Sequence, residues 1–317
     1  MNLRFMARYP FSSKAKEYVG ETQLQIDYDV IQRAKRRLSS ALSKGEIPKL
    51  ELELPESLEA ELAAYAVARM MVSVIGSRFL ISRYAVAESK RAMAYLKLKK
   101  GEEGLREQEL GEISSQFGIA LGKHGDDYSM CVVDYLQFTP KAVEYKLINR
   151  KLKDGRVLLK RSEFIRVVSE AIKKAVEETL PIDKSKIPGE VKKAAEEMKR
   201  ELPKEEASSR VNLNEEDYPP CVKALLESLR LSENLPHNAR FALSVYLLNT
   251  GKKVEEVMKV FSTAPDFDEK ITRYQVEYAN KKGYTMPGCR AMEVYGLCTA
   301  NCRVKNPLNY RSRKARK

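Results

Sequence analysis

The chain has 317 residues, of which 43% are hydrophobic and 32% are charged, and its formal net charge is +13. This length suffices for two domains with separate cores, and five cysteines are too few for a short disulfide-stabilised secreted scaffold. No apolar run approaches the roughly 20 residues of a membrane helix, and the N-terminus lacks a secretory signal pattern. These features predict a cytoplasmic protein with no membrane partner. The positive charge is typical of proteins that bind nucleic acid, although it also keeps a large protein soluble.

The N-terminal part of the chain predicts a helical domain. Helical periodicity covers residues 27–44, 58–75, 78–99 and 103–117. Gly76 and Ser77 separate the second helix from the third, and basic residues followed by Gly101 form a stop signal after the third. The second and third helices are therefore expected to form an αα-hairpin.

From about residue 128 the pattern changes to that of a small α/β subdomain, which is expected to end near residue 180. Residues 130–136 alternate as in a strand, and Asp154-Gly155 separates two β-rich segments as in a hairpin. Ser162 is the expected N-cap of the helix that follows. Cys131, within the strand-like run, is interpreted as a small buried hydrophobic side chain. The predicted N-terminal domain thus covers residues 1–180 and includes this subdomain.

The next segment, residues 181–217, is highly charged and interrupted by prolines, which predicts a linker with one charged helix over residues 190–201. Residues 218–317 form the predicted C-terminal domain. It is helical up to Gly283, then loop-rich, and it ends in a basic tail. The domain contains 18 Lys and Arg against 9 Asp and Glu, so it holds +9 of the net charge of +13.

Four of the five cysteines lie in the C-terminal domain with the spacing C-x67-C-x8-C-x3-C: Cys221, Cys289, Cys298 and Cys302. Four thiolates are the ligand set of both structural zinc sites and [4Fe–4S] clusters. Zinc ribbons usually take two ligands from each of two tight turns, whereas here only the last two cysteines are close in sequence. The dispersed spacing therefore favours an iron–sulfur cluster, with zinc as the alternative. If no metal is bound, the four cysteines would be unrelated buried thiols or would include a disulfide.

Basic and aromatic side chains accompany the cysteines. His237 and Arg240 share one helical face, where they could contact phosphates, although a solvated face is the commoner explanation. Further along, cations and rings alternate as in proteins that stack single-stranded bases on aromatic side chains: Arg273, Tyr274, Tyr278, Lys281 and Lys282.

The sequence contains little that indicates catalysis. Asp266 and Asp268 form an Asp-x-Asp pair of the type that binds metal ions in nucleotidyl transfer, but their position before a helix favours an N-cap role. No phosphate-binding glycine loop, dinucleotide fingerprint or nucleophile elbow is found. We therefore expect no catalytic site, with a self-sufficient nucleotidyltransferase that uses the two aspartates as an alternative.

Seven motifs in the C-terminal domain occur in the order found in one known family. They are PPC (219–221), LPHNARF (235–241), FDEKITRYQVEY (267–278), PGC (287–289), YGLC (295–298), NC (301–302) and NPL (306–308). Together with YPF (9–11) and RYAVAESK (83–90), they make the chain resemble the large subunit of archaeal and eukaryotic DNA primase, in its archaeal branch. The resemblance spans nearly the whole chain.

The resemblance implies a mostly α-helical protein. Its helical N-terminal domain, with the small α/β subdomain, would dock the catalytic small subunit, and its helical, loop-rich C-terminal domain would hold a [4Fe–4S] cluster on the four cysteines. That domain would engage template DNA, the RNA primer and the initiating nucleoside triphosphate, and the polymerising carboxylates would belong to the other subunit. It also implies a nucleoid-associated replication complex, in which further replication proteins would be partners.

The resemblance also assigns roles to individual residues. Its conserved basic helix maps onto His237 and Arg240, and its Tyr-Gln-Val-Glu stretch begins at Tyr274. The expected nucleic-acid and nucleotide contacts are His237, Arg240, Arg273, Tyr274, Lys281 and Lys282. The expected contacts with the small subunit lie in the hairpin-containing segment: Val143, Tyr145, Leu147, Val157 and Leu159. Eukaryotic members often have a further His where this chain has Asn234, so a nucleotide contact there is expected to be weaker.

The sequence therefore predicts a non-catalytic primase large subunit that contains an iron–sulfur cluster. A zinc-dependent nucleic-acid-binding module is the alternative.

Overall fold

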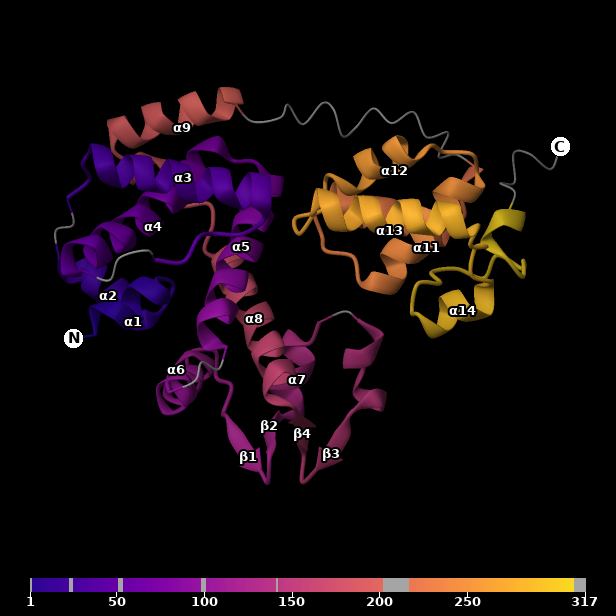
Figure 1. Ribbon diagram of the computed structural model, residues 1–317, viewed down its shortest axis with the longest axis horizontal. Helices are drawn as coiled ribbons and strands as arrows, with labels where there is room; N and C mark the ends of the chain where they lie inside the picture. The colour runs from indigo at the N-terminus through magenta and orange to yellow at the C-terminus, as the bar shows by residue number, and fades with distance from the viewer. Residues whose placement is uncertain are drawn as a thin grey trace. The chain divides into compact units, whose positions relative to one another are not determined.

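The computed structural model describes residues 2–22, 25–50, 54–97, 101–140, 142–201 and 217–310. The basic tail that the sequence predicts after residue 310 lies outside them. The fold is mostly α-helical with one small antiparallel sheet, which confirms the predicted fold class (Figure 1). None of the helices in these ranges is long and apolar enough to cross a bilayer.

The chain divides into two compact units, which we describe separately. The first comprises residues 1–140 and 145–202, and the second comprises residues 203–317 with residues 141–144. The helices of the first unit are α1 (Leu3–Arg8), α2 (Ser13–Glu21), α3 (Tyr28–Lys44), α4 (Pro55–Ile75), α5 (Arg78–Leu96), α6 (Glu103–Ser115), α7 (Val132–Phe138), α8 (Arg161–Glu178) and α9 (Gly189–Glu201). Short 3-10 turns are η1 (Val143–Tyr145), η2 (Leu147–Asn149) and η3 (Lys184–Lys186).

The predicted αα-hairpin is α4 and α5. Gly76 ends α4 in the left-handed conformation, with φ of 71°, which suits a residue without Cβ, and the Ser77 side chain then caps α5. Helix α3 packs on α4, and α8 packs on α5. These helices bury one continuous hydrophobic core.

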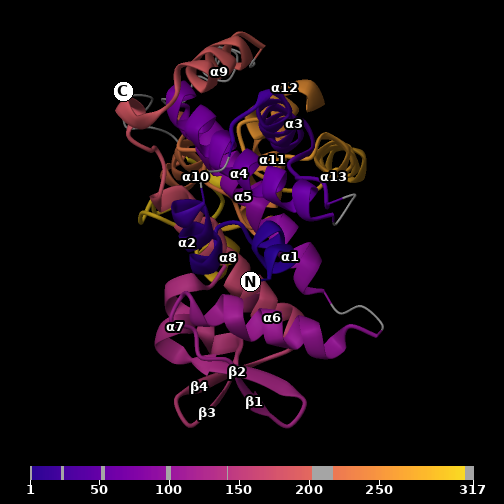
Figure 2. The same ribbon diagram turned by 90° about the vertical axis from the view of Figure 1, so that its left-hand side faces the viewer.

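Helix α9 belongs to this core, although the sequence predicts it within a linker. It lies along α3 and α4, as both ribbon views show (Figure 2), and it buries Val191, Ala195 and Met198. The helix itself is present as predicted, but its apolar face makes it part of the first unit. Residues 202–216 of the predicted linker lie outside the described residues.

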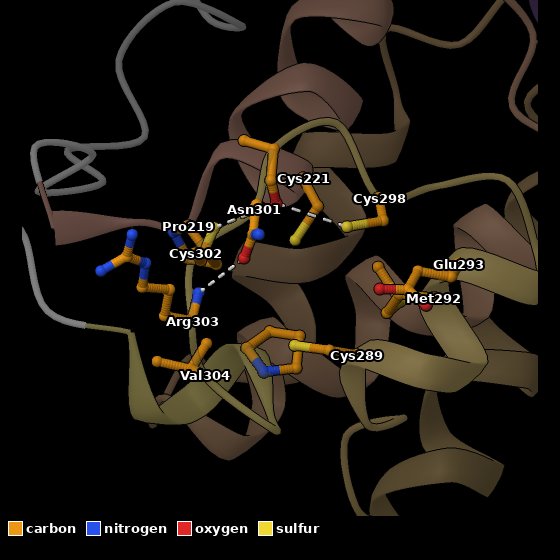
Figure 3. Close-up of a pocket in the computed structure, with 12 residues that line it drawn as sticks. Pro219, Cys221, Cys289, Met292, Glu293, Cys298, Asn301, Cys302, Arg303 and Val304 are labelled. Carbon is orange, nitrogen blue, oxygen red and sulfur yellow. Dashed lines mark hydrogen bonds between the residues drawn. The ribbon is translucent and has the colours of Figure 1, made fainter.

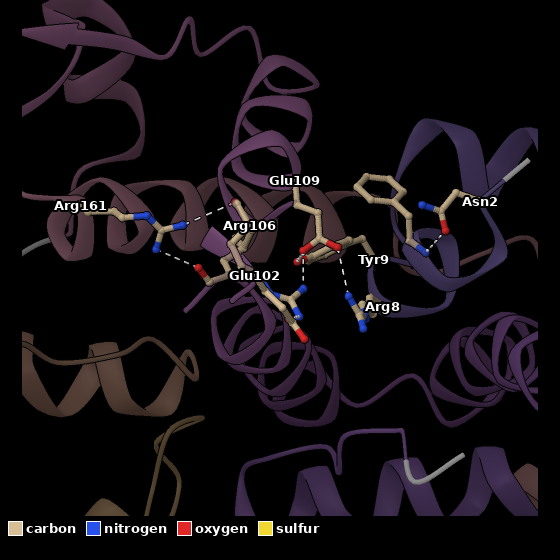
Figure 4. Close-up of polar contacts among 9 residues, drawn as sticks. Asn2, Arg8, Tyr9, Glu102, Arg106, Glu109 and Arg161 are labelled. Carbon is tan, nitrogen blue, oxygen red and sulfur yellow. Dashed lines mark hydrogen bonds and ion pairs between the residues drawn. The ribbon is translucent and has the colours of Figure 1, made fainter. Parts of the chain in front are cut away.

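A buried polar cluster joins α1 to α6 (Figure 4). The carboxylate of Glu109 accepts hydrogen bonds from Arg8 Nη1 at 3.2 Å, the Tyr9 hydroxyl at 2.9 Å and Arg106 Nη1 at 2.6 Å. Burial and the neighbouring Glu109 raise the pKa of Tyr9 well above its usual range, so its hydroxyl stays protonated and acts as a donor. Several donors to one buried carboxylate offset the cost of removing it from water.

The sheet has the strand order β1-β2-β4-β3 and is antiparallel throughout. Its strands are β1 (Gly122–His124), β2 (Asp127–Cys131), β3 (Lys151–Lys153) and β4 (Arg156–Leu159). Asp154 and Gly155, with φ of 48° and 72°, form the hairpin turn between β3 and β4 that the Asp-Gly pair predicts. Helix α8 covers the face that carries Met130, Val157 and Leu159.

Parts of the predicted α/β subdomain differ from the expectation. The strand-like run 130–136 is strand only to Cys131, and α7 then begins, because helical geometry buries both Tyr135 and Phe138 on one face. The β-rich segment before β3 forms η1 and η2 instead of a strand. The N-cap of α8 is Lys160 and not Ser162, since the Glu163 carboxylate accepts a hydrogen bond from the Lys160 amide at 2.8 Å.

The second unit has its own hydrophobic core, built from helices that the sequence predicts with few changes. They are α10 (Pro220–Arg230), α11 (His237–Asn249), α12 (Val254–Phe261), α13 (Glu269–Lys282) and the short α14 (Cys289–Val294), followed by the 3-10 turn η6 (Pro307–Asn309). Helix α13 packs against both α11 and α12. From residue 284 to residue 310 the chain is irregular apart from α14 and η6, as expected.

Candidate metal centre and nucleic-acid interface

Four cysteines that are far apart in sequence line one cavity of about 410 Å³ (Figure 3). Cys221 comes from the first turn of α10, Cys289 is the first residue of α14, and Cys298 and Cys302 come from the loop after α14. The structure thus brings together the complete set of cysteines that the sequence predicts as metal ligands.

Close packing of two backbone segments positions Cys289. The Cys289 amide donates a hydrogen bond to the Lys305 carbonyl at 2.9 Å. A Cβ atom on Gly288 would lie only 3.2 Å from the same carbonyl oxygen. Glycine before the cysteine therefore allows α14 to begin against the segment that follows Cys302.

The loop that carries Cys298 and Cys302 starts at the end of α14. Gly296 has φ of 71°, and the Leu297 amide donates to the Met292 carbonyl at 2.8 Å, which turns the chain sharply at the end of the helix. The thiols of Cys298 and Cys302 both donate to the Ala300 carbonyl at 3.5 Å (Figure 3). One carbonyl therefore holds both side chains on the same side of the loop.

Burial is the main influence on the pKa values of three of the four thiols. The pKa of Cys221 is raised to about 11, mainly by burial and to a smaller extent by the neighbouring Cys302 and Cys298, while a backbone hydrogen bond from Val222 acts in the opposite direction. The pKa values of Cys289 and Cys302 are also raised, first by burial and then by nearby thiols. Several thiolates around one cavity would repel one another, so a cation among them would favour the ligating form. Among the described residues, no three His, Cys, Asp or Glu side chains form a group suited to one metal ion.

Cys131 does not line this cavity. It is the N-cap residue of α7 in the first unit and is partly buried. The sequence interpretation, which keeps it out of the metal site, is consistent with this position.

Arg240 is held by other protein groups. Its Nε donates to the Leu235 carbonyl at 2.8 Å, and its Nη2 pairs with the carboxylate of Asp266. His237, the first residue of α11, is exposed. Asp268 caps α13 by accepting a hydrogen bond from the Ile271 amide at 2.9 Å. Each aspartate of the Asp-x-Asp pair thus has a structural partner, which does not favour the alternative of a two-metal site.

Arg273 lies among acidic side chains. Its guanidinium nitrogens lie 3.9 Å from Glu255, 3.5 Å from Glu269 and 3.8 Å from Glu277. These carboxylates are exposed and partly offset its charge, and the contact of Arg273 with a phosphate stays a prediction.

The predicted Tyr274 belongs to a row of aromatic rings that continues from α13 to α11. Tyr274 stacks on Tyr278 with ring centroids 6.1 Å apart and an interplanar angle of 23°. Tyr278 contacts Tyr284 at 6.2 Å, and Tyr284 contacts Phe241 at 5.6 Å. The three tyrosines are exposed, and Lys282 Nζ lies 5.7 Å from the Tyr278 centroid. Lys281 is exposed as well.

We refer to Tyr274, Tyr278, Tyr284 and Phe241 as the ring row. The mixture of rings and cations in the sequence predicts the two tyrosines of α13, but no sequence pattern indicates the other two members. The helical periodicity of α13 cannot predict either of them, because Tyr284 follows the end of α13 and Phe241 comes from another helix. Only packing between helices brings them together.

Two of the five residues predicted to contact a partner subunit are buried, and two others are half-buried. Val157 and Leu159 are buried under α8, and Tyr145 and Leu147 pack partly against the core. The side chain of Val143 lies outside the described parts of the structure. Among the described side chains of the same subdomain, the large apolar ones that are exposed are Val133 and Leu136 on α7, Ile148 on η2 and Leu152 on β3.

These exposed residues belong to elements that are joined to one another. The Tyr135 hydroxyl of α7 donates to the Tyr145 carbonyl of η1 at 2.6 Å, and β3 is hydrogen-bonded to β4, which α7 contacts. We call Val133, Leu136, Ile148 and Leu152 the apolar set. The sequence alone did not separate the apolar set from the buried residues. A strand and a helix with the same sequence bury different side chains, so the exposed ones are known only once the type of element is known.

Comparisons with known proteins cover nearly the whole chain. Residues 22–188 match a family described as eukaryotic and archaeal DNA primase, large subunit N-terminal domain, and residues 211–316 match the C-terminal domain of the same subunit. Among similar proteins is the DNA primase large subunit PriL of Methanocella arvoryzae, 33% identical over 96% of this chain and 87% of the relative. PriL of Methanococcoides burtonii is 33% identical over 99% of this chain and 93% of the relative, and PriL of Halobacterium salinarum is 30% identical over 98% and 93%.

Proposed function

This chain belongs to the family of archaeal and eukaryotic DNA primase large subunits, and we propose that it initiates primers as the non-catalytic partner of a primase small subunit. In this proposal the second unit holds an iron–sulfur cluster and engages template DNA and the initiating nucleoside triphosphate. The first unit binds the catalytic subunit. Primer synthesis by this chain alone, abolished by Asp268→Ala, would contradict the proposal.

The observation that carries the proposal is the convergence of four cysteines on one cavity. Thiolates are the ligands of [4Fe–4S] clusters, and four cysteines line this cavity. Cys221, Cys289, Cys298 and Cys302 would hold the cluster. The described residues after Gly283 contain little regular structure besides α14 and η6. A cluster bound there would supply folding free energy that this segment otherwise lacks. We therefore propose a mainly architectural role for the cluster.

Iron and sulfide analysis with a visible spectrum tests the cluster. Full-length protein purified without oxygen is expected to contain iron and sulfide in about equal amounts, with a thiolate-to-iron absorption band. Cys298→Ser is expected to lose most of the iron and to destabilise the second unit. Cys131→Ser is the matched control, because it removes a partly buried thiol that does not line the cavity, and it should retain the iron.

Zinc is the other outcome of this experiment. Colourless protein with equimolar zinc and no sulfide would support the alternative of a zinc-dependent nucleic-acid-binding module and would contradict the iron–sulfur proposal. Unchanged iron in Cys298→Ser would show that this thiol is not a ligand.

The ring row supports the engagement of single-stranded nucleic acid. Proteins that bind single strands stack bases on exposed aromatic side chains, and each stacked base contributes about 1–3 kcal/mol. Lys281 and Lys282 lie at the end of α13, where they would contact the backbone of the strand. His237 and Arg240 would contact phosphates of the nucleotide, with charge-assisted hydrogen bonds.

Oligonucleotides with abasic sites separate stacking from phosphate contacts. The wild-type chain is expected to bind an intact single strand more tightly than an abasic strand of equal length. Tyr278→Ala should lose most of this preference, while Tyr278→Phe should keep it, because a phenyl ring still stacks. If Tyr278→Ala weakens binding to both strands equally, the ring row does not read bases.

We propose that the catalytic subunit docks on the α/β subdomain through the apolar set. Ile148 is 88% exposed and Val133 is 69% exposed, which is unusual for branched aliphatic side chains. Membership of this family implies a catalytic partner, and interfaces between stable subunits have apolar centres. This proposal replaces the buried Val157 and Leu159 with exposed residues of the same subdomain.

A further inference from the structure

One edge of the Arg240 guanidinium is held by two protein oxygens. Nε donates to the Leu235 carbonyl at 2.8 Å, and Nη2 pairs with the Asp266 carboxylate. Nε–H and one Nη2–H lie on the same side of the planar group, so both contacts use this side edge. One Nη1 hydrogen and the second Nη2 hydrogen form the end edge, which matches the spacing of two phosphate oxygens.

Asp266 is itself held in place. It lies in the turn between α12 and α13, where the Phe267 amide donates to the Ala264 carbonyl at 3.1 Å and Asp268 caps the next helix. The side chains of Arg240 and Asp266 are 18% and 29% exposed. A half-buried carboxylate on a fixed turn restricts the rotation of the guanidinium much more than an exposed ion pair would.

We propose that Asp266 is a positioning residue for phosphate recognition. It holds the side edge of Arg240 so that the end edge is presented to the triphosphate of the initiating nucleotide. The inference rests on the proposed role of Arg240 in initiation, and it assigns to Asp266 a function different from metal binding. Asp266 itself does not contact the nucleotide in this proposal.

Initiation kinetics of the full chain in complex with its catalytic subunit test this role. Asp266→Ala is expected to raise the KM for the initiating nucleoside triphosphate about tenfold, as for loss of one charged hydrogen bond. The kcat for extending a supplied primer should not change. Asp266→Asn retains an oxygen acceptor without the charge, so its KM should lie between those of the wild type and Asp266→Ala. Glu227→Ala is the control, since it removes an exposed carboxylate that pairs with Arg230 of the same helix.

The Arg240→Ala background separates failure of this inference from failure of the proposed function. There Asp266→Ala should have no further effect on KM. If Arg240→Ala leaves KM unchanged, the proposed role of Arg240 is wrong. If Arg240→Ala raises KM but neither Asp266 variant does, or if they lower it, the positioning role alone is overturned. Iron content and the unfolding midpoint are measured for each variant, and Asp266→Asn decides the result if Asp266→Ala does not fold.

Discussion

Asp266 and Asp268 illustrate how two identical side chains acquire different roles from their surroundings. Asp268 accepts a hydrogen bond from an amide of the helix that follows it, which is a local role that sequence predicts. Asp266 pairs with Arg240, which lies 26 residues earlier in the chain, and no local pattern indicates this partner. The same Asp-x-Asp motif would also fit a metal site. Only the contacts of the two side chains distinguish a metal site from structural roles.

The charge of Glu163 is expected to stabilise the first unit in a pH-dependent manner. Burial raises its pKa, but hydrogen bonds from Arg150 at 2.7 Å and from the Lys160 amide at 2.8 Å outweigh burial and lower the pKa overall. A carboxylate whose pKa is lower in the folded state contributes stability above its unfolded pKa of about 4.3, and this contribution is lost as the pH falls through the folded value.

We therefore expect Glu163→Gln to lower the unfolding free energy by about 1 kcal/mol near pH 7. The difference from the wild type should shrink as the pH falls below about 4, because the wild-type carboxylate is then protonated. Urea unfolding between pH 7 and pH 3 measures this difference. Glu178→Gln, on the exposed end of the same helix, is the matched control and should have little effect. A difference that does not depend on pH would contradict the assignment.

At the scale of elements, the α/β subdomain shows how tertiary packing changes a local pattern. The run after Met130 alternates as a strand would, yet α7 begins at Val132, which places Tyr135 and Phe138 in the core and leaves Val133 and Leu136 exposed. Helix α7 therefore presents two apolar side chains to solvent at i and i+3, on one face. This face exists only because the strand ends at Cys131.

Leu136→Glu is expected to weaken binding of the catalytic subunit by at least tenfold, because a charge would be buried in an apolar interface. The stability of the isolated chain should not change, since Leu136 is already exposed. Affinity measured with the purified small subunit tests this expectation. Leu54→Glu places the same change at a similarly exposed leucine outside the apolar set, and it should bind normally. Equal loss of affinity in both variants would argue against a docking role for the set.

At the scale of the whole molecule, the chain consists of two units with separate hydrophobic cores. The proposed metal centre belongs to the second unit, and the apolar set belongs to the first. The two proposals therefore predict opposite defects. Cys298→Ser should lose iron and keep the catalytic subunit, whereas Leu136→Glu should keep iron and lose the subunit. Joint loss of both properties in either variant would contradict this division of roles.

The sequence alone determined much of this protein. Helical periodicity and stop signals predicted most helices, the Asp-Gly pair predicted the β3–β4 hairpin, and ordered motifs identified the family. Each of these signals depends on neighbours within a few residues or on order along the chain, so it survives without knowledge of packing. The same four cysteines that the spacing selected are those that line the cavity.

The tertiary structure decided what depends on contacts between distant segments. It buried Val157 and Leu159, joined α9 to the first core, paired Arg240 with Asp266, and placed Tyr284 and Phe241 beside the tyrosines of α13. The periodicity of a segment predicts which face of its helix or strand a residue occupies. It does not predict which residues of other elements pack against that face. Exposure and charge pairing are properties of the packed surface, and they follow only once the helices and strands have been assembled.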